Sequence, residues 1–101
     1  MTQNEKITLL IFDVLDEINA QLSEDKQVKK SLTTVLYGEK GKLDSIGLVN
    51  LIVAVEQKLQ DELGLTITLA TERAMSQKNS PFRSVQSLLN YITLLLEENV
   101  R

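Results

Sequence analysis

The chain has 101 residues, enough for one domain, and its 43% hydrophobic and 25% charged residues are typical of a globular protein rather than a disordered one. It has no Cys and no His, which excludes disulfides, thiol chemistry, the usual zinc sites and a Ser-His-Asp triad. The formal charge of −3 argues against a nucleic-acid-binding protein, because such proteins usually present a basic face. Composition therefore argues against a conventional enzyme.

The sequence carries no pattern typical of secretion or membrane insertion. Its polar N-terminal residues lack the basic and apolar regions of a signal peptide. The longest apolar stretches, at 51–55 and 94–96, are far too short to cross a bilayer, and no helical pattern pairs an apolar face with a Lys/Arg-rich one. We therefore expect a cytoplasmic monomer that binds neither nucleic acid nor a membrane.

The first predicted helix covers about residues 3–22. Thr2 and Glu5 form the T-x-x-E pattern of a capping box, which indicates where the helix begins. The apolar residues that follow are spaced three, four and seven apart, as on one face of a helix: Ile7, Leu10, Ile11, Val14, Leu15, Ile18 and Leu22. Three acidic residues, Asp13, Asp16 and Glu17, lie off this stripe. We interpret them as a solvated face rather than as paired catalytic carboxylates.

Helical periodicity is lost between residues 23 and 43, where Gly38 and Gly41 indicate turns. A structureless connection of this length is unusual in a compact domain and is often functional. Within it, the stretch 29–36 is predicted to form a short irregular helical turn. The sequence therefore predicts a long first loop.

The second predicted helix covers about residues 45–63 and ends before Gly64, a residue typical of the position after a helix. At about 100° per residue, one face forms a buried stripe. Ile46, Val49 and Val53 form a second apolar set, with Val49 expected at the edge of the core. The stripe comprises Leu48, Leu51, Ile52, Val55, Leu59 and Leu63, and the polar side comprises Asn50, Ala54, Gln57 and Asp61.

The remaining segments complete an all-α prediction. Residues 65–69 alternate like a strand but have no partner strand, so an extended segment is expected. A short helix is predicted at about 71–75, and Ser84 is predicted to cap a last helix at about 85–98. The whole chain, 1–101, is thus expected to be a single domain of three long helices and one short helix.

The segment from Gly41 to Leu51 resembles the signature of the acyl carrier protein superfamily, in which Asp-Ser is followed by Leu, Ile or Met and then a helix with apolar residues at set intervals. Here Asp44, Ser45 and Ile46 occupy these positions. Further matches are Leu65-Thr66-Ile67 after this helix and Phe82-Arg83-Ser84-Val85 at the start of the last one. The resemblance spans nearly the whole chain and implies an acyl-carrier-protein-like bundle.

The resemblance implies a function without catalysis. In the family, a Mg²⁺-dependent phosphopantetheinyl transferase moves 4′-phosphopantetheine from coenzyme A to the serine hydroxyl, and the cargo rides as a thioester on the thiol of this arm. Ser45 is the implied attachment residue. Because the chain has no Cys, the thiol would have to come from the prosthetic group. The implied partners are the transferase and enzymes that load or use acyl or aminoacyl groups, namely ligases, synthases and transferases.

The resemblance also implies roles for residues near Ser45. Asp44 matches the acidic residue before the serine, which either caps the helix or helps to seat the metal of the transferase. Three apolar positions, Ile46, Val49 and Val53, match those that carriers present to partner enzymes. Glu56, Asp61 and Glu62 either form an acidic surface for basic partners or a merely solvated face.

Two departures from the family pattern bear on the pathway. Gly47 and Asn50 stand where carriers of fatty-acid synthesis often have acidic residues. They favour a carrier for a specialised pathway that makes polyketides, nonribosomal peptides or related compounds. An alternative is an unmodified helical adaptor that binds its partner through Ile46 and Val53, in which Ser45 only starts a helix.

Overall fold

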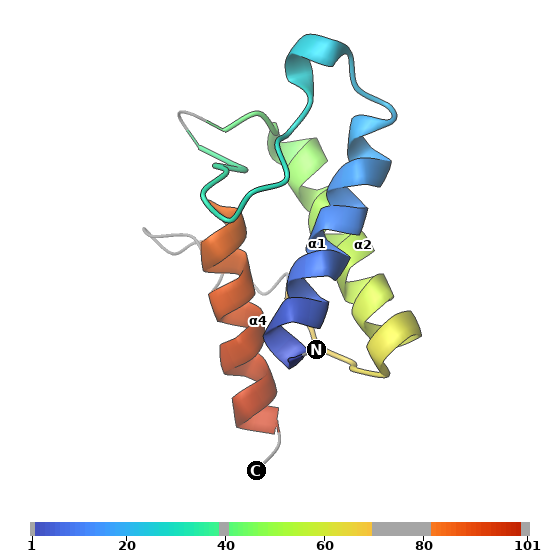
Figure 1. The fold of residues 1–101 in the computed structure, drawn as a ribbon, viewed down its shortest axis with the longest axis vertical. Coiled ribbons are helices and arrows are strands. Elements are labelled where there is room, and N and C mark those ends of the chain that lie inside the picture. The colour runs from blue at the N-terminus through green and yellow to red at the C-terminus, as the bar shows by residue number, and fades with distance from the viewer. Residues whose placement is uncertain (1, 39–40, 70–81, 100–101) are drawn as a thin grey trace.

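The computed structural model describes residues 2–38, 41–69 and 82–99, except the side chains of residues 45, 98 and 99. It contains three α-helices, α1 (Gln3–Asn19), α2 (Ser45–Leu63) and α4 (Val85–Asn99), and one 3₁₀ helix, η1 (Glu24–Lys26). α1 runs antiparallel to both α2 and α4, and the long first loop closes one end of the bundle (Figure 1). The three long helices of the prediction are confirmed.

The described ranges contain no strand, and a single isolated β-bridge joins Val35 to Ser84. The all-α class is therefore confirmed for these ranges, whereas the short helix predicted at 71–75 lies outside them. Within the same ranges, no helix has both the length and the apolar character needed to cross a bilayer.

α1 begins as predicted but ends earlier. The hydroxyl oxygen of Thr2 accepts a hydrogen bond from the backbone N–H of Glu5 at 3.2 Å, so Thr2 is the N-cap. The helix ends at Asn19 instead of continuing to Leu22. The physical reason is a contact distant in sequence, because the side-chain amide of Asn19 bonds to the backbone of Val28 and draws the loop back against the end of the helix. The predicted end of this helix was therefore wrong.

The first loop is held to the start of α4 by backbone hydrogen bonds. The N–H of Leu36 donates to the carbonyl of Arg83 at 2.7 Å, and the N–H of Val85 donates to the carbonyl of Thr34 at 3.1 Å. Within 29–36, where a short irregular helical turn is predicted, residues 31–34 form one hydrogen-bonded turn, in which the N–H of Thr34 donates to the carbonyl of Ser31 at 3.2 Å. The loop also contains the 3₁₀ helix η1, which was not predicted.

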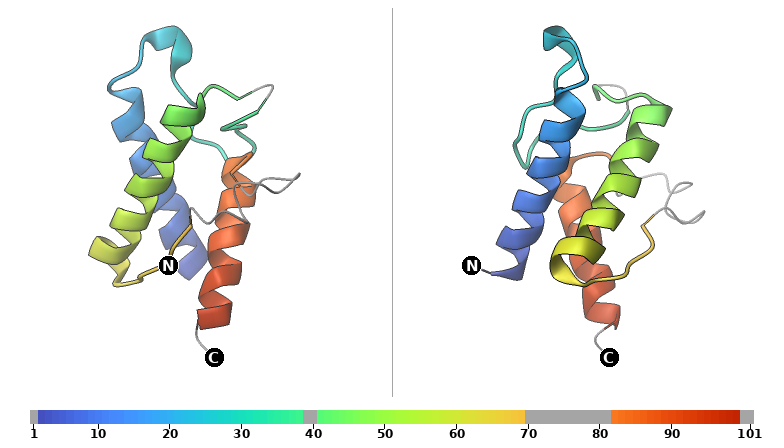
Figure 2. Two further views of the ribbon diagram at one scale, coloured as in Figure 1. Left: turned by 180° about the vertical axis from the view of Figure 1, so that it is seen from behind. Right: turned by 90° about the vertical axis from the view of Figure 1, so that its right-hand side faces the viewer.

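The core lies between the three helices and is sealed by the loop and the segment after α2 (Figure 2). Gly64 ends α2 in the left-handed conformation, with φ +66°, as predicted for this position. Residues 65–69 are extended, as expected from their alternation, with Ile67 and Leu69 buried. The fully buried large side chains from the helices include Ile7, Ile11, Leu15, Leu51, Ile52, Leu59, Leu88 and Ile92.

α4 begins at Val85 with the predicted cap. The backbone N–H of Ser87 donates to the Ser84 hydroxyl at 3.1 Å, and the N–H of Ser84 donates to the Ser87 hydroxyl at 3.0 Å. The two serines thus satisfy one another's backbone N–H groups, in the manner of a capping box. This reciprocal cap fixes the place where the first loop is attached.

Candidate functional site

The candidate site is the start of α2. Asp44 is the N-cap: its Oδ1 accepts a hydrogen bond from the N–H of Gly47 at 2.7 Å, and its carbonyl accepts one from the N–H of Leu48 at 2.9 Å. Leu43, just before it, is buried, and its N–H donates to the carbonyl of Leu36 at 3.0 Å. The start of α2 is therefore held by the bonds of Asp44 to the first turn and by the bond of Leu43 to the first loop, and Ser45 is the first residue of the helix. The side chain of Ser45 lies outside those described.

The first turn of α2 suits an anionic group. Asp44 takes two of its N–H groups, whereas the N–H of Ile46 has no partner within the described part of the chain. An anion near the N-terminus of a helix is stabilised by about 0.3–1 kcal/mol at an exposed position. Lys42, three residues before Ser45 in the sequence, adds a positive charge near this turn, although its amine already donates to the carbonyl of Asp25 at 2.9 Å. The N–H of Ile46 thus suits the phosphodiester that the family resemblance implies on Ser45, whereas the carboxylate of the cap residue Asp44 opposes a second negative charge there.

An exposed apolar patch, formed by Ile46, Val49 and Val53, follows the start of the helix. The exposed fractions of these residues are 73%, 47% and 52%. The prediction that Val49 lies at the edge of the core was wrong, because nearly half of it is exposed and it belongs to the patch. Exposed apolar residues gathered in this way are typical of contact surfaces for other proteins. α2 therefore carries both a core face and a separate apolar surface.

The acidic residues of α2 are mostly engaged in contacts within the molecule. A carboxylate oxygen of Glu56 accepts a hydrogen bond from the backbone N–H of Leu69, so Glu56 holds the extended segment against the helix. Glu62 lies 3.6 Å from the amine of Lys58, which also pairs at 3.1 Å with Glu17 on α1. The hydrogen bond that Lys58 donates to Glu17 raises the pKa of Lys58 above its ordinary value, and the nearby negative charges add to this, although partial burial opposes it. The acidic surface that the resemblance implied is thus partly neutralised.

A cleft of about 840 Å³ lies between the end of α1, the first loop and the first half of α2. Sequence reasoning did not predict it, although Gly47, Asn50 and Ala54 recur at helical spacing on the polar side of α2 and were its only signal. The lining consists of Glu17, Ile18, Gln21, Leu22, Lys26, Gly41, Lys42, Leu43, Asp44, Gly47, Asn50 and Ala54. The cleft therefore begins beside Ser45 and follows a face of α2 that does not include the apolar patch.

Within the described part of the chain, no three side chains of His, Cys, Asp or Glu are grouped so as to hold a metal ion. Comparisons of the chain with protein-family models, with curated proteins and with solved structures found no match. The resemblance of residues 41–51 to the acyl carrier protein signature therefore rests on the sequence of this chain alone.

Proposed function

We propose that this protein is an acyl carrier protein, which carries acyl or aminoacyl intermediates as thioesters on a 4′-phosphopantetheine arm attached to Ser45. The observation that carries this proposal is the position of Ser45 as the first residue of α2, directly after the cap residue Asp44 and directly before the exposed Ile46. A covalent carrier needs its attachment residue at such a place, where a partner enzyme can contact the helix and reach the hydroxyl together. The protein itself catalyses nothing in this role.

The apolar patch supplies the docking surface in this proposal. Partner enzymes, namely the phosphopantetheinyl transferase and the enzymes that load or use the cargo, would bury Ile46, Val49 and Val53. Burial of apolar surface contributes about 25 cal/mol per Å², so even a small patch adds useful affinity. We propose that Asp44 acts by capping α2, and that Glu56, which is bonded to Leu69, lies at the margin of the docking surface.

The proposal extends to the pathway and to the whole bundle. Gly47 and Asn50 leave the start of α2 without the acidic side chains of a fatty-acid carrier, and the ion pair of Glu62 with Lys58 offsets one more negative charge on this helix. These features support a carrier in a specialised pathway, of the polyketide, nonribosomal peptide or a related type.

The same proposal places the protein in the cytoplasm as a monomer and adds a short helix at 71–75 to the three long helices.

A second candidate is an unmodified adaptor that binds a partner through Ile46 and Val53. The observation that favours it is the exposure of these two side chains, which would suit protein binding with or without an arm on Ser45. In this case Ser45→Ala leaves partner binding intact, whereas Val53→Asp abolishes it. In the carrier, Ser45→Ala abolishes loading.

The deciding experiment treats the purified protein with a phosphopantetheinyl transferase of broad specificity, coenzyme A and Mg²⁺, followed by intact-protein mass spectrometry. We expect the mass to increase by one phosphopantetheine group in the wild type and in Ser31→Ala, a control on the first loop, and to stay unchanged in Ser45→Ala. An unmodified wild type, under conditions that modify a known carrier completely, contradicts the carrier function.

A further inference from the structure

The cleft between α1 and α2 has the size and the composition of a ligand site. Its volume of about 840 Å³ lies within the range of about 300–1,000 Å³ that is common for small-molecule sites. Apolar side chains, including Ile18, Leu22 and Leu43, share the lining with polar ones. A slender ligand that alternates hydrocarbon and hydrogen-bonding groups would match such walls better than a purely apolar or a highly charged one.

Two side-chain amides in the cleft are available to a ligand. Gln21, two residues after the end of α1, and Asn50 on α2 both line it, and neither side chain makes a hydrogen bond within the described part of the chain. Each offers one carbonyl oxygen and two N–H donors, which complement the N–H and carbonyl of an amide in a ligand. The cleft can thus bind a ligand that itself contains amide groups.

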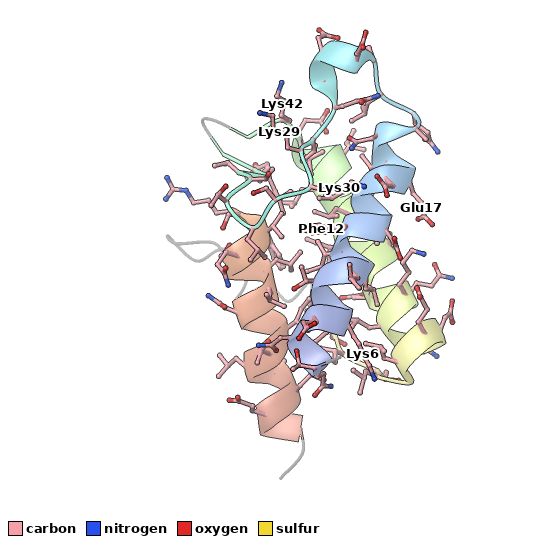
Figure 3. The ribbon with its side chains drawn as sticks, viewed as in Figure 1. Lys6, Phe12, Glu17, Lys29, Lys30 and Lys42 are labelled. Atoms are coloured by element: carbon pink, nitrogen blue, oxygen red, sulfur yellow. The ribbon has the colours of Figure 1, made fainter. Side chains whose placement is uncertain are left out.

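The charges of the cleft favour an anion at its loop end. Lys26 and Lys42 line this end, close to the start of α2, and Lys42 is seen there in Figure 3. Two carboxylates also line the cleft: that of Glu17 is paired with Lys58 at 3.1 Å, and that of Asp44 accepts a hydrogen bond from the N–H of Gly47. The expected ligand therefore carries its negative charge near Lys26 and Lys42 and its uncharged part farther along α2.

Gly47 keeps the cleft open next to the cap. A Cβ atom at this position would lie 3.2 Å from Oδ1 of Asp44, so a side chain here would crowd the carboxylate of the cap residue, while its 3.4 Å contact with Cδ2 of Leu43 would be ordinary. A glycine inside a helix costs about 0.5–1 kcal/mol relative to alanine. Gly47 therefore lowers the stability of the helix at a position of α2 that lines the cleft near Asp44.

We propose that this cleft binds the pantetheine portion of an arm attached to Ser45 of the same chain. The inference rests on the proposed carrier function and adds to it a resting site for the arm. Pantetheine contains two amide groups separated by short hydrocarbon segments, and its phosphate would remain beside Ser45 near the two lysines. From Gly47 to Ala54 the helix rises about 10 Å, which gives the cleft a length suited to such a chain.

The arm would reach the cleft by passing around the start of the helix. At about 100° per residue, Ile46 lies between Ser45 and Asn50 around the helix axis. The arm thus passes over the exposed side chain of Ile46 and enters beside Asn50. In this position it covers part of the apolar patch, so a partner enzyme that binds the patch displaces the arm from the cleft and receives its thiol.

The test compares backbone amide NMR spectra of the apo protein and of the protein loaded with phosphopantetheine, whose mass is measured first. We expect loading to shift the amide signals of Gln21, Gly47 and Asn50. The variant Asn50→Leu, which removes one amide and narrows the cleft, should still be loaded but should lose at least half of the shift at Gln21. The control variant Gln60→Leu, on the exposed surface of the same helix, should keep it.

The possible outcomes separate the two proposals. If the wild type accepts the arm but the signal of Gln21 does not move, the resting site is wrong and the carrier function stands. If no arm is added, the carrier function is wrong and the resting site with it. Titration of the apo protein with free coenzyme A distinguishes an attached arm from a free ligand. If micromolar coenzyme A shifts the amide signals of Gln21, Gly47 and Asn50 but loading of Ser45 does not, the cleft binds a free ligand and the inference is overturned.

Discussion

The side-chain amide of Asn19 makes two hydrogen bonds with the backbone of Val28: its Nδ2 donates to the carbonyl at 2.8 Å, and its Oδ1 accepts from the N–H at 2.7 Å. One side chain thereby ends α1 and satisfies both backbone groups of a residue that is buried in the core. The first loop, which leads to Ser45, depends on this contact for its course.

Removal of this contact tests its contribution to stability. We expect Asn19→Ala to lower the free energy of unfolding by about 1–3 kcal/mol, because the donor and the acceptor of Val28 are left without a partner in a partly buried place. Urea denaturation followed by circular dichroism measures the change. Lys29→Ala, which removes an exposed side chain from the same loop, should stay within about 0.5 kcal/mol of the wild type. Equal losses in both variants would contradict a special role for Asn19.

The two roles considered for Asp44 can be separated by two substitutions. Asp44→Ala removes the cap of α2 and should cost about 0.5–2 kcal/mol of stability. Asp44→Asn keeps an acceptor for the N–H of Gly47 and should stay close to the wild type, since both residues cap well. If capping is the whole role, the rate at which a transferase loads Ser45 is also unchanged in Asp44→Asn. A stable Asp44→Asn variant that is loaded slowly would assign the carboxylate to the metal of the transferase instead.

The two apolar faces of α2 should respond differently to substitution. Leu51 is fully buried, so Leu51→Ala should lower the free energy of unfolding by about 2–5 kcal/mol. Val53 is about half exposed, so Val53→Asp should change it by less than about 0.5 kcal/mol. Thermal and urea unfolding of the two variants provide the comparison. A large loss of stability in Val53→Asp would mean that the apolar patch is covered within the protein and is not available to partners.

The ion pairs of Lys58 predict a dependence of stability on pH. The bond to Glu17 raises the pKa of Lys58 in the folded protein above 10.5, its value without such contacts. The stabilisation is therefore complete below pH 10.5 and is lost as the pH rises through the folded-state pKa. Lys58→Met should be slightly less stable than the wild type at neutral pH, and the difference should shrink at strongly alkaline pH. Urea midpoints of both proteins across this range test it, and a difference that grows with pH would reverse the expected sign.

Features set by neighbouring residues in the sequence could be predicted from it. The caps at Thr2 and Ser84 and the end of α2 at Gly64 depend on contacts within a few residues, and all three were predicted. The start of α2 at Ser45 was predicted for the same reason, since its cap Asp44 bonds within one turn. Local hydrogen bonding therefore identified the beginning of the candidate site.

Features that depend on distant contacts could not be predicted. The end of α1 is set by Val28 and the course of the first loop by Arg83, and neither partner can be inferred from helical periodicity. The exposure of Val49 depends on which elements cover α2, and the periodicity of a single helix does not tell this. The cleft likewise exists only because the end of α1 and the first loop meet α2 at Gly47.

The bridge between Val35 and Ser84 has a consequence for synthesis of the chain. The loop that precedes Ser45 is held by residues near the start of α4, so the native approach to α2 cannot be completed until that distant part of the polypeptide has left the ribosome. Modification of a nascent chain would then have to wait for its last helix. A modifying enzyme that requires the finished structure would thus leave incomplete chains untouched.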